Sequence, residues 1–397
     1  MRQAVGGITF LVSLALFFFI SNFLGGWYVY HQMGFDNNFR FEDGAQVKGE
    51  VLDLYVEYIT GQKGYKIAVI GDSVVQGAGV PGRDQTITAH LQDELCGSYL
   101  REARVFNLGL PGGRPADLFL TLKKLHEAGA VQLVIVNISY PFFSDEMART
   151  PLLYYKVWAP LLTEEERKGL KVPAEKQGVP KAPAAQPETG GSIEAENFLQ
   201  WKVASLWSVY RFRQELNRFL FGGPPAVKLK EFFNLTFKGE APPREQPEEP
   251  DQEEPLSEKD KPENKYNVWY SFPWNDRDLE HLANVFNVND SNLNFKYYRE
   301  LCQYLEANKI PAVIFMSPVN RDLLKQYRLL DQGSFLENTN LIGQVARQSG
   351  VPFLDYQNAV SLDLFHDSMH MLDGGNAATA KLLSQDLQPV IRGALNR

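Results

Sequence analysis

The stretch KIAVIGDS, Lys66–Ser73, decides the fold of this chain. Its apolar run Ile67–Ile70 is short and uninterrupted, which is typical of a buried strand in a parallel sheet. Gly71 and Asp72 end the run, and Ser73 follows at the carboxyl end of the predicted strand. Ligands bind at that end of the strands in open α/β folds. We therefore predict that Ser73 lies at a ligand-binding edge of a sheet.

Apolar strands alternate with helical patterns on both sides of a long central stretch. The further predicted strands are 105–108, 131–138, 312–316 and 351–355. The predicted helices are 86–100, 115–128, 292–308, 335–349 and 375–387. Helices that connect parallel strands cover both faces of the sheet. The pattern predicts an α/β fold, a three-layer parallel sheet with helices on both faces.

A second polar signature stands late in the chain, where Asp367-Ser368-Met369-His370 has an Asp-x-x-His spacing. A serine hydroxyl is a weak nucleophile until an imidazole takes its proton and a carboxylate fixes the tautomer of that imidazole. Ser73 at a strand end, together with this late Asp and His, is the arrangement that a nucleophilic hydrolase or acyltransferase needs.

These motifs resemble those of the SGNH hydrolase family, also called GDSL esterases or lipases. Gly71-Asp72-Ser73 is similar to the first block of the family, and Asn107–Gly112 is similar to the second. Asp367–His370, with the predicted helix that follows Asp373, is similar to the last block. The resemblance covers 65–140 and 291–395 and implies an SGNH-like, flavodoxin-like sheet.

The resemblance also implies roles for individual residues. Ser73 would attack a carbonyl carbon, His370 would act as general base and then as general acid, and Asp367 would orient His370. The backbone N–H groups of Ser73 and Gly109, with the side-chain amide of Asn137, would hold the oxyanion. The chain departs from the family pattern around Asn137, because the flanking glycine and the following aspartate of Gly-x-Asn-Asp are missing. An asparagine that only caps a strand end therefore stays open as an alternative.

The remaining motifs predict no cofactor and no metal site. His366 lies beside the candidate carboxylate but lacks its spacing, and His90, His126 and His281 are expected on the surface or in the core. No Cys/His cluster has zinc-ligand spacing. The glycine-rich stretch 77–82 contains proline and has no ribose-binding acid after a second strand, so it is a weak dinucleotide motif.

The N-terminus predicts a membrane segment. Residues 8–30 are 23 uncharged residues, long enough as a helix for a bilayer core of about 30 Å. We predict an uncleaved anchor at 1–30, with a cleaved signal peptide as the alternative. A tether follows at 31–65, with one amphipathic stretch around Val51–Ile59. Arg2 precedes the apolar run, which favours a catalytic part outside the cytoplasm and a single-pass protein of the cell membrane. In that compartment the two cysteines, Cys96 and Cys302, either pair or remain free thiols.

A long insertion, 142–290, separates the predicted catalytic halves 66–141 and 291–397. Two segments of it, 171–191 and 238–265, are rich in Pro and Glu and are predicted to be disordered. Between them, residues 193–221 form an aromatic-rich amphipathic pattern. We expect this helix to pack against the catalytic domain. Substrate lining, partner docking and contact with the membrane surface stay open as alternatives.

Charge and architecture narrow the class of function. The net charge of −8 argues against a nucleic-acid partner. We predict a membrane-anchored extracytoplasmic serine esterase that acts on an O-acyl ester. One alternative is an O-acyltransferase acting on a cell-envelope polysaccharide or teichoic acid. The architecture resembles teichoic-acid D-alanine transfer and exopolysaccharide O-acetylation proteins, and this alternative would add a membrane-bound acyltransferase as a partner. The other alternative is a non-catalytic protein that binds glycan or acts as a scaffold.

Overall fold

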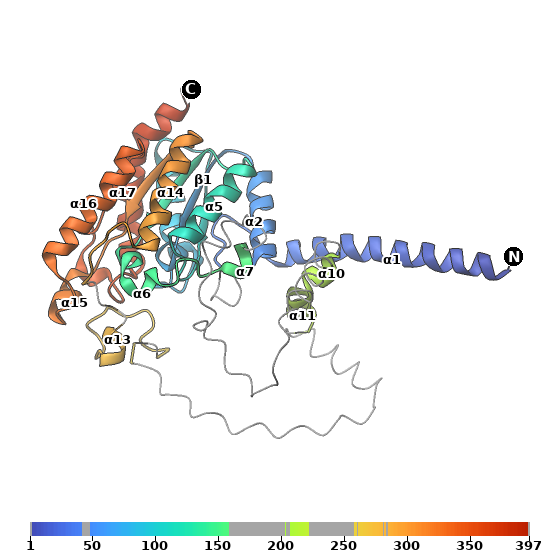
Figure 1. Ribbon diagram of the computed structural model, residues 1–397, viewed down its shortest axis with the longest axis horizontal. Helices are drawn as coiled ribbons and strands as arrows, with labels where there is room; N and C mark the ends of the chain where they lie inside the picture. Colours follow the sequence, from blue (N-terminus) through green and yellow to red (C-terminus); the bar gives the residue numbers. More distant parts are fainter. Residues whose placement is uncertain are drawn as a thin grey trace, which may run out of the picture. The chain divides into compact units, whose positions relative to one another are not determined.

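A single parallel sheet forms the centre of the computed structural model (Figure 1). Its strands are β1 (Tyr65–Gly71), β2 (Ala103–Gly109), β3 (Leu133–Ile138), β4 (Ala312–Met316) and β5 (Phe353–Asp355). The structure describes residues 2–41, 48–158, 203, 207–221, 258–259, 261–280, 282 and 285–395. It divides into two compact units: residues 1–35 with 177–254, and residues 36–176 with 255–397.

The strand order is β2-β1-β3-β4-β5, with every neighbouring pair parallel. The chain leaves β1 for β2 at one edge and then returns to place β3 on the other side of β1. This is the flavodoxin-like order, in which the switch point lies between the carboxyl ends of β1 and β3. The predicted α/β fold class is confirmed.

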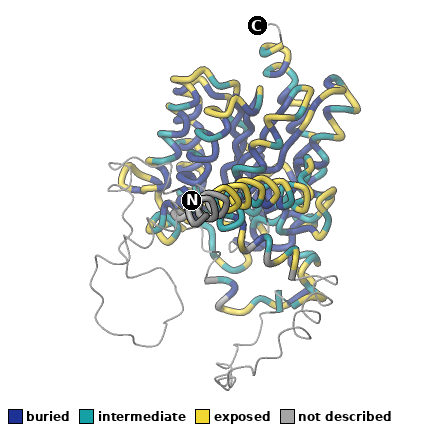
Figure 2. Tube along the Cα trace, turned by 90° about the vertical axis from the view of Figure 1, so that its right-hand side faces the viewer, coloured by how far each residue is buried: buried dark blue, intermediate teal, exposed yellow. Residues whose placement is uncertain are grey.

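Two layers of helices cover the sheet. The first consists of α4 (Ile87–Ser98) and α17 (Asp373–Leu395), which pack together and share one apolar core with alternate residues of β1 and β3. The second contains α5 (Pro115–Glu127), α14 (Leu293–Ala307) and α16 (Gln332–Gln348). Figure 2 shows the buried residues gathered on the strands and on the helix faces turned toward them. The remaining elements of this unit are short: α3 (Ser73–Gln76), η1 (Arg83–Gln85), η2 (Tyr140–Phe143), α6 (Asp145–Ala148), α7 (Tyr155–Trp158), α13 (Asp276–Glu280), α15 (Arg321–Gln326) and η5 (Leu362–Leu364).

Some predicted boundaries differ from the observed ones, because a capping residue or a proline determines where the helix or strand begins or ends. Helix α16 begins three residues before the predicted 335, because Asp331 caps it by accepting the N–H of Ser334. Helix α17 runs on to Leu395, past the predicted end at 387 and through Pro389. Strand β5 begins only at Phe353, since Pro352 has no N–H for the ladder.

Much of the predicted tether at 31–65 is folded, and its amphipathic stretch is a helix. Residues Gly49–Gly61 form helix α2, which buries Tyr55 and Ile59 completely. Phe39 and Phe41 are also buried, and both rings contact Tyr55. An aromatic cluster of this size removes the segment from water, so it belongs to the folded unit that contains the sheet.

The two ends of the predicted insertion 142–290 also belong to that unit. Trp158 at the end of α7 is fully buried and donates from Nε1 to Asp117. Trp269 donates from its backbone N–H to Phe365 O and from Nε1 to Leu362 O, both at 2.9 Å. The segment 171–191 and most of 238–265, predicted to be disordered, lie outside the described residues. The thiols of Cys96 and Cys302 are free, and burial raises the pKa of Cys302 to about 12.

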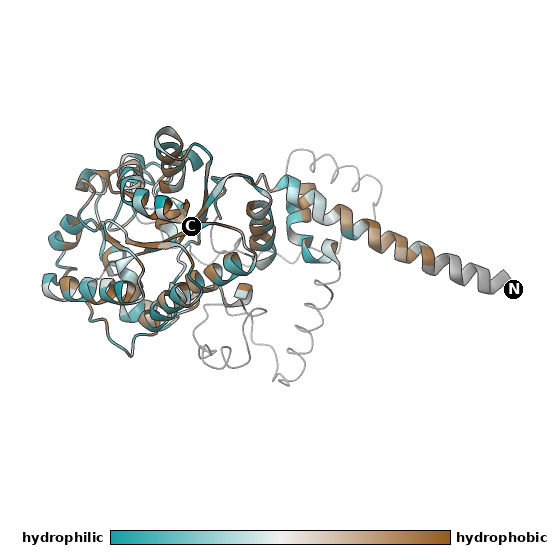
Figure 3. Ribbon diagram, turned by 90° about the horizontal axis from the view of Figure 1, so that it is seen from above, coloured by the Kyte–Doolittle hydropathy of each residue, from teal (hydrophilic) through white to brown (hydrophobic). Residues whose placement is uncertain are grey.

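The other unit contains helix α1 (Arg2–Gln32) and two short helices, α10 (Ser208–Arg211) and α11 (Arg213–Phe221). Within α1, Val12–Gln32 is long and apolar enough to cross a membrane, a criterion that a signal sequence also meets. Figure 3 shows the hydrophobic colouring along this helix. The amphipathic pattern at 193–221 is therefore two helices interrupted at Phe212, as far as its described residues extend.

Glycine at the end of β2 allows a first prediction. A Cβ atom on Gly109 would lie 2.1 Å from Gln76 N and 2.8 Å from Asp72 O, both backbone atoms that cannot move aside. We expect Gly109→Ala to lower the free energy of unfolding by about 1–3 kcal/mol or more, as overpacking does, measured by urea unfolding followed by circular dichroism. The matched control is Gly97→Ala, because Gly97 is exposed in α4 and its Cβ would meet open space. The free energy of unfolding of that variant should be higher by about 0.5–1 kcal/mol. Equal unfolding midpoints for both variants would contradict the prediction.

Candidate active site

Ser73 stands at the sharp turn between β1 and α3. Asp72 precedes it and caps α3, accepting the N–H of Val74 on Oδ1 at 2.9 Å. Ser73 is partly exposed, whereas Asp72 and Val74 are buried. Among the described residues, none accepts a hydrogen bond from the Ser73 N–H. The turn therefore presents both the hydroxyl and this backbone N–H at the carboxyl edge of the sheet.

The predicted nucleophile, base and carboxylate form one hydrogen-bonded chain. Ser73 Oγ lies 2.7 Å from His370 Nε2, and His370 Nδ1 lies 2.6 Å from Asp367 Oδ2. The Asp367 side chain is 8% exposed and that of His370 is 21% exposed. The carboxylate is thus at the buried end of the chain and the hydroxyl at the open end. This is the geometry in which an imidazole can take a proton from a serine.

The backbone around Asp367 fixes its orientation. Its Oδ1 accepts the N–H groups of Met369 at 2.9 Å and His370 at 2.7 Å, which leaves Oδ2 for the imidazole. Asn320, after β4, donates its amide to Asp367 O at 3.1 Å and its backbone N–H to Ser368 O at 2.9 Å. Asn320 therefore ties the base-carrying loop to the sheet. Sequence reasoning missed it, because no local pattern links it to that loop.

The charge of Asp367 makes the imidazole of His370 hold its proton more firmly than usual. Burial alone would lower the pKa of His370, but attraction by Asp367 and the hydrogen bond between them outweigh it and raise the pKa above 6.5. For Asp367, burial acts upward, yet the charge of His370 and the hydrogen bonds to it hold the pKa well below its usual range. The carboxylate is therefore charged at any pH near neutrality.

Asp72 is a second buried carboxyl group close to the same histidine. Its pKa is raised by burial, against hydrogen bonds from Ser139 and the Val74 N–H and the charge of His370. Asn137 is fully buried at the end of β3, and with its amide correctly oriented its nitrogen donates to Asp72 Oδ1 at 3.2 Å. One amide proton of Asn137 is thus committed to Asp72. Its predicted role as an oxyanion donor stays a prediction.

The predicted oxyanion donor Gly109 is wrong. Its N–H donates to Asn107 Oδ1 at 2.9 Å and cannot also bind a substrate oxygen. Gly112 lies in the turn just beyond, with φ +67°, and is exposed. Its N–H meets no acceptor within the described part of the chain. The turn lies beside the nucleophile strand, since Leu110 N donates to Gly71 O at 2.9 Å.

Asp117 stabilises this turn indirectly, through the segment that contains Tyr154. It is fully buried in α5 and accepts the N–H groups of Leu153 and Tyr154 as well as the indole of Trp158. Tyr154 in turn donates its hydroxyl to Pro111 O in the turn. Burial raises the pKa of Asp117 to about 6, against the hydrogen bonds from these donors. The sequence contains no signal for these distant partners.

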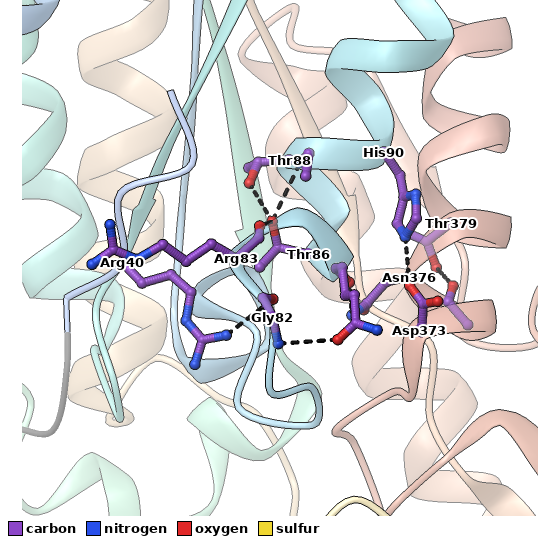
Figure 4. A network of polar contacts seen from close by, with 12 residues as sticks. Arg40, Gly82, Arg83, Thr86, Thr88, His90, Asp373, Asn376 and Thr379 are labelled. Carbon is purple, nitrogen blue, oxygen red and sulfur yellow. Dashed lines mark hydrogen bonds and ion pairs between the residues drawn. The ribbon is translucent and has the colours of Figure 1, made fainter. Parts of the chain in front are cut away.

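A polar network fixes the loop that follows α3 (Figure 4). The guanidinium of Arg40 donates to Val80 O and Gly82 O at 3.1 and 3.3 Å. On the other side, His90 of α4 lies 2.7 Å from Asp373 at the start of α17. Helix α17 directly follows the loop that contains His370. These contacts therefore fix the position of that loop relative to the turn that contains Ser73.

The other histidines lie outside the hydrogen-bonded chain of three. His366 is buried, with Nδ1 2.8 Å from Asn267 O, and His126 is exposed against the ring of Tyr304. His281 lies outside the described residues. Within the described ranges, no three His, Cys, Asp or Glu side chains gather as a metal site. A cavity of about 710 Å³ lies at the amino ends of β4 and β5, away from the triad.

Comparison with protein-family models and with curated proteins gives no match. Several solved structures are similar. An acetyl xylan esterase, AlAXEase, shares 12% identity at a TM-score of 0.37, with 82% of this chain and 99% of that chain covered. LAE5, an alpha/beta hydrolase enzyme from the metagenome of Lake Arreo, shares 12% at 0.34, with coverage of 82% and 96%. A carbohydrate acetylesterase family member from Sinorhizobium meliloti shares 12% at 0.29, with coverage of 84% and 100%. Similarity this low does not identify an activity.

The Asp367–His370 pair generates a prediction about pH. Ser73 can be activated only by neutral His370, so its reaction with a fluorophosphonate should accelerate as pH rises through a pKa above 6.5. Asp367→Asn removes the charge that raises this pKa and leaves burial, which lowers it. We expect the acid limb to move to lower pH and the rate at neutral pH to fall by a factor of order 10⁴. The measurement is the rate of covalent labelling between pH 5 and 9, and an unmoved limb would refute the assignment of His370.

Proposed function

We propose that this chain is a serine esterase of the SGNH type that cleaves an O-acyl ester. The observation that carries the proposal is the continuous hydrogen-bonded chain from Ser73 Oγ through His370 to Asp367. A different structural feature positions each member. Ser73 follows the end of β1, His370 lies in a hairpin-like loop, and Asp367 is held by an Asx turn. A chance contact between surface side chains would have no such support.

The geometry supports a two-step acyl transfer. In the first step Ser73 Oγ attacks the ester carbonyl while His370 Nε2 takes its proton, and the same proton then goes to the departing alkoxide. In the second step water attacks the acyl-serine, with His370 again as base, and Ser73 is released. The charge of Asp367 stabilises the imidazolium in both steps.

The oxyanion would form close to two free backbone donors. We assign these as the N–H groups of Ser73 and Gly112, in place of the expected Gly109. A preorganised donor of this kind is typically worth about 2.7–4 kcal/mol in the transition state. The positive φ at Gly112 explains why glycine is needed there, since other residues rarely adopt it.

The apolar helix α1 supports a position at the cell membrane. If it is retained as an anchor, the catalytic unit is held outside the cytoplasm, and its esters would be those of the cell envelope. The length and composition of Val12–Gln32 support this part of the proposal.

The decisive test uses p-nitrophenyl acetate and a fluorophosphonate probe. We expect Ser73→Ala to abolish both hydrolysis and labelling, and His370→Ala to reduce both by a factor of order 10⁴ or more. Mass spectrometry should find the phosphonyl group on Ser73. His126→Ala is the matched control, because His126 is exposed in α5, packs against the ring of Tyr304 and lies outside the chain of three. Its activity should stay close to that of the wild type.

Two results would count against the proposal. Hydrolysis that survives in Ser73→Ala would exclude this serine as the nucleophile. An acyl-Ser73 that a saccharide discharges faster than water does would replace hydrolysis with acyl transfer to a hydroxyl group.

A further inference from the structure

One face of α1 is occupied by a segment from the middle of the insertion. Phe18, Ser21, Asn22 and Gly25 follow the i, i+3, i+4, i+7 spacing of a single helix face. The ring of Trp207 stacks on Phe18 with 5.3 Å between centroids. Helix α1 and helix α10, which follows Trp207, belong to the same compact unit, and they lie side by side in Figure 1.

The contact pairs polar groups that an apolar helix would otherwise leave exposed. Trp207 Nε1 donates to Ser21 Oγ at 3.1 Å, and Ser208 N donates to Asn22 Oδ1 at 2.5 Å. The hydroxyl of Ser208 donates to Asn22 O. Unpaired polar groups are costly in hydrocarbon, and small or polar residues of this kind join helices inside membranes.

The order of contacts gives the direction of the segment. Trp207 meets Phe18, and Val209 lies at Gly25, where an added Cβ would be 3.0 Å from Val209 Cγ2. Phe212 follows, 4.0 Å from the corresponding position of Gly26. The segment therefore runs parallel to α1, with its start deeper and its end nearer the C-terminal end of α1.

The depth follows from helix geometry. Phe18 precedes Tyr30 by twelve residues, which is about 18 Å along the helix axis. With Trp27 and Tyr30 at the interface, Trp207 would lie near the middle of a bilayer core of about 30 Å. One helical turn before it, Val203 is 37% exposed, and the neighbouring faces of α1 expose Phe17 and Phe19.

We propose that the insertion segment 207–221, with Val203 before it, is a second membrane-embedded element, docked on α1 and entering the same leaflet from the side of the catalytic unit. Its occupant is the lipid bilayer: acyl chains contact Val203, and headgroups lie at the level of α11. Exposed Arg213, stacked on Tyr210 at 4.3 Å, and exposed Arg218 suit that level. This inference rests on the proposed anchoring by α1.

The experiment measures depth in liposomes of phosphatidylethanolamine and phosphatidylglycerol with the full-length protein. Cys96 is replaced by serine, and buried Cys302 is left in place. Single cysteines at Val203, Leu220 and Leu336 carry an NBD label, Leu336 being an exposed position of α16 in the catalytic unit. We expect doxyl groups deep in the acyl chains to quench the label at 203 and shallow doxyl groups to quench that at 220. Only aqueous iodide should quench the label at 336.

Docking is tested separately from anchoring. Gly25→Ile places a side chain against Val209, so the label at 203 should lose its quenching by deep doxyl groups. Phe23→Ile changes the exposed side of α1 and should leave that quenching intact. A label at Phe19→Cys reports whether α1 itself is embedded.

Hydrolysis of p-nitrophenyl acetate should be unchanged in these variants, which keeps this inference apart from the proposed esterase activity. A label at 203 that iodide quenches as strongly as the label at 336, while the label at 19 stays protected, would overturn the proposal. Loss of protection at 19 would overturn it together with the anchor.

Discussion

The site depends on a gap at the carboxyl ends of β1 and β2 that is too narrow for a methyl group. Gly71 and Gly109 are register partners there, and a Cβ on Gly71 would lie 2.4 Å from Val75 Cγ2 and 2.9 Å from Asn137 Cβ. Because neither glycine has a side chain, α3 can lie directly over both strand ends. The register of two strands therefore places Ser73 over the crevice at the switch point, where His370 reaches it from the other half of the chain.

Two buried carboxyl groups near His370 differ in pKa because the charge of His370 and the hydrogen bonds, and not burial alone, act on them to different extents. Asp72 and Asp367 are buried to a similar degree, but their pKa values move in opposite directions. Asp367 receives two backbone N–H groups and the imidazole, and all three favour the charged form. Asp72 has weaker support and caps the turn. The first is suited to stabilise an imidazolium, and the second to hold the nucleophile in place.

Short-range patterns carried most of what could be predicted. The strand before Ser73 and the spacing of Asp367 and His370 are local patterns, so both could be recognised in the sequence without knowledge of the fold. The oxyanion donor was misassigned because only the fold shows that Asn107 occupies the N–H of Gly109. The Pro-Gly-Gly turn did contain a signal, since a glycine with positive φ is common in such turns. The amphipathic pattern of helix α2 was visible in the sequence, but its packing was not, because the aromatic cluster that covers its apolar face forms only in the fold.

The insertion is joined to the site at both of its ends, which a simple spacer would not require. Where it leaves the catalytic unit, Tyr154 is bonded to the turn that contains Gly112. Where it returns, Asn267 O accepts His366, one residue before Asp367. The turn that contains Gly112 and the loop that contains Asp367 and His370 are thus each bonded to one end of the same insertion. A shift of either end of the insertion would therefore reach the Gly112 turn or the Asp367 loop through a single hydrogen bond.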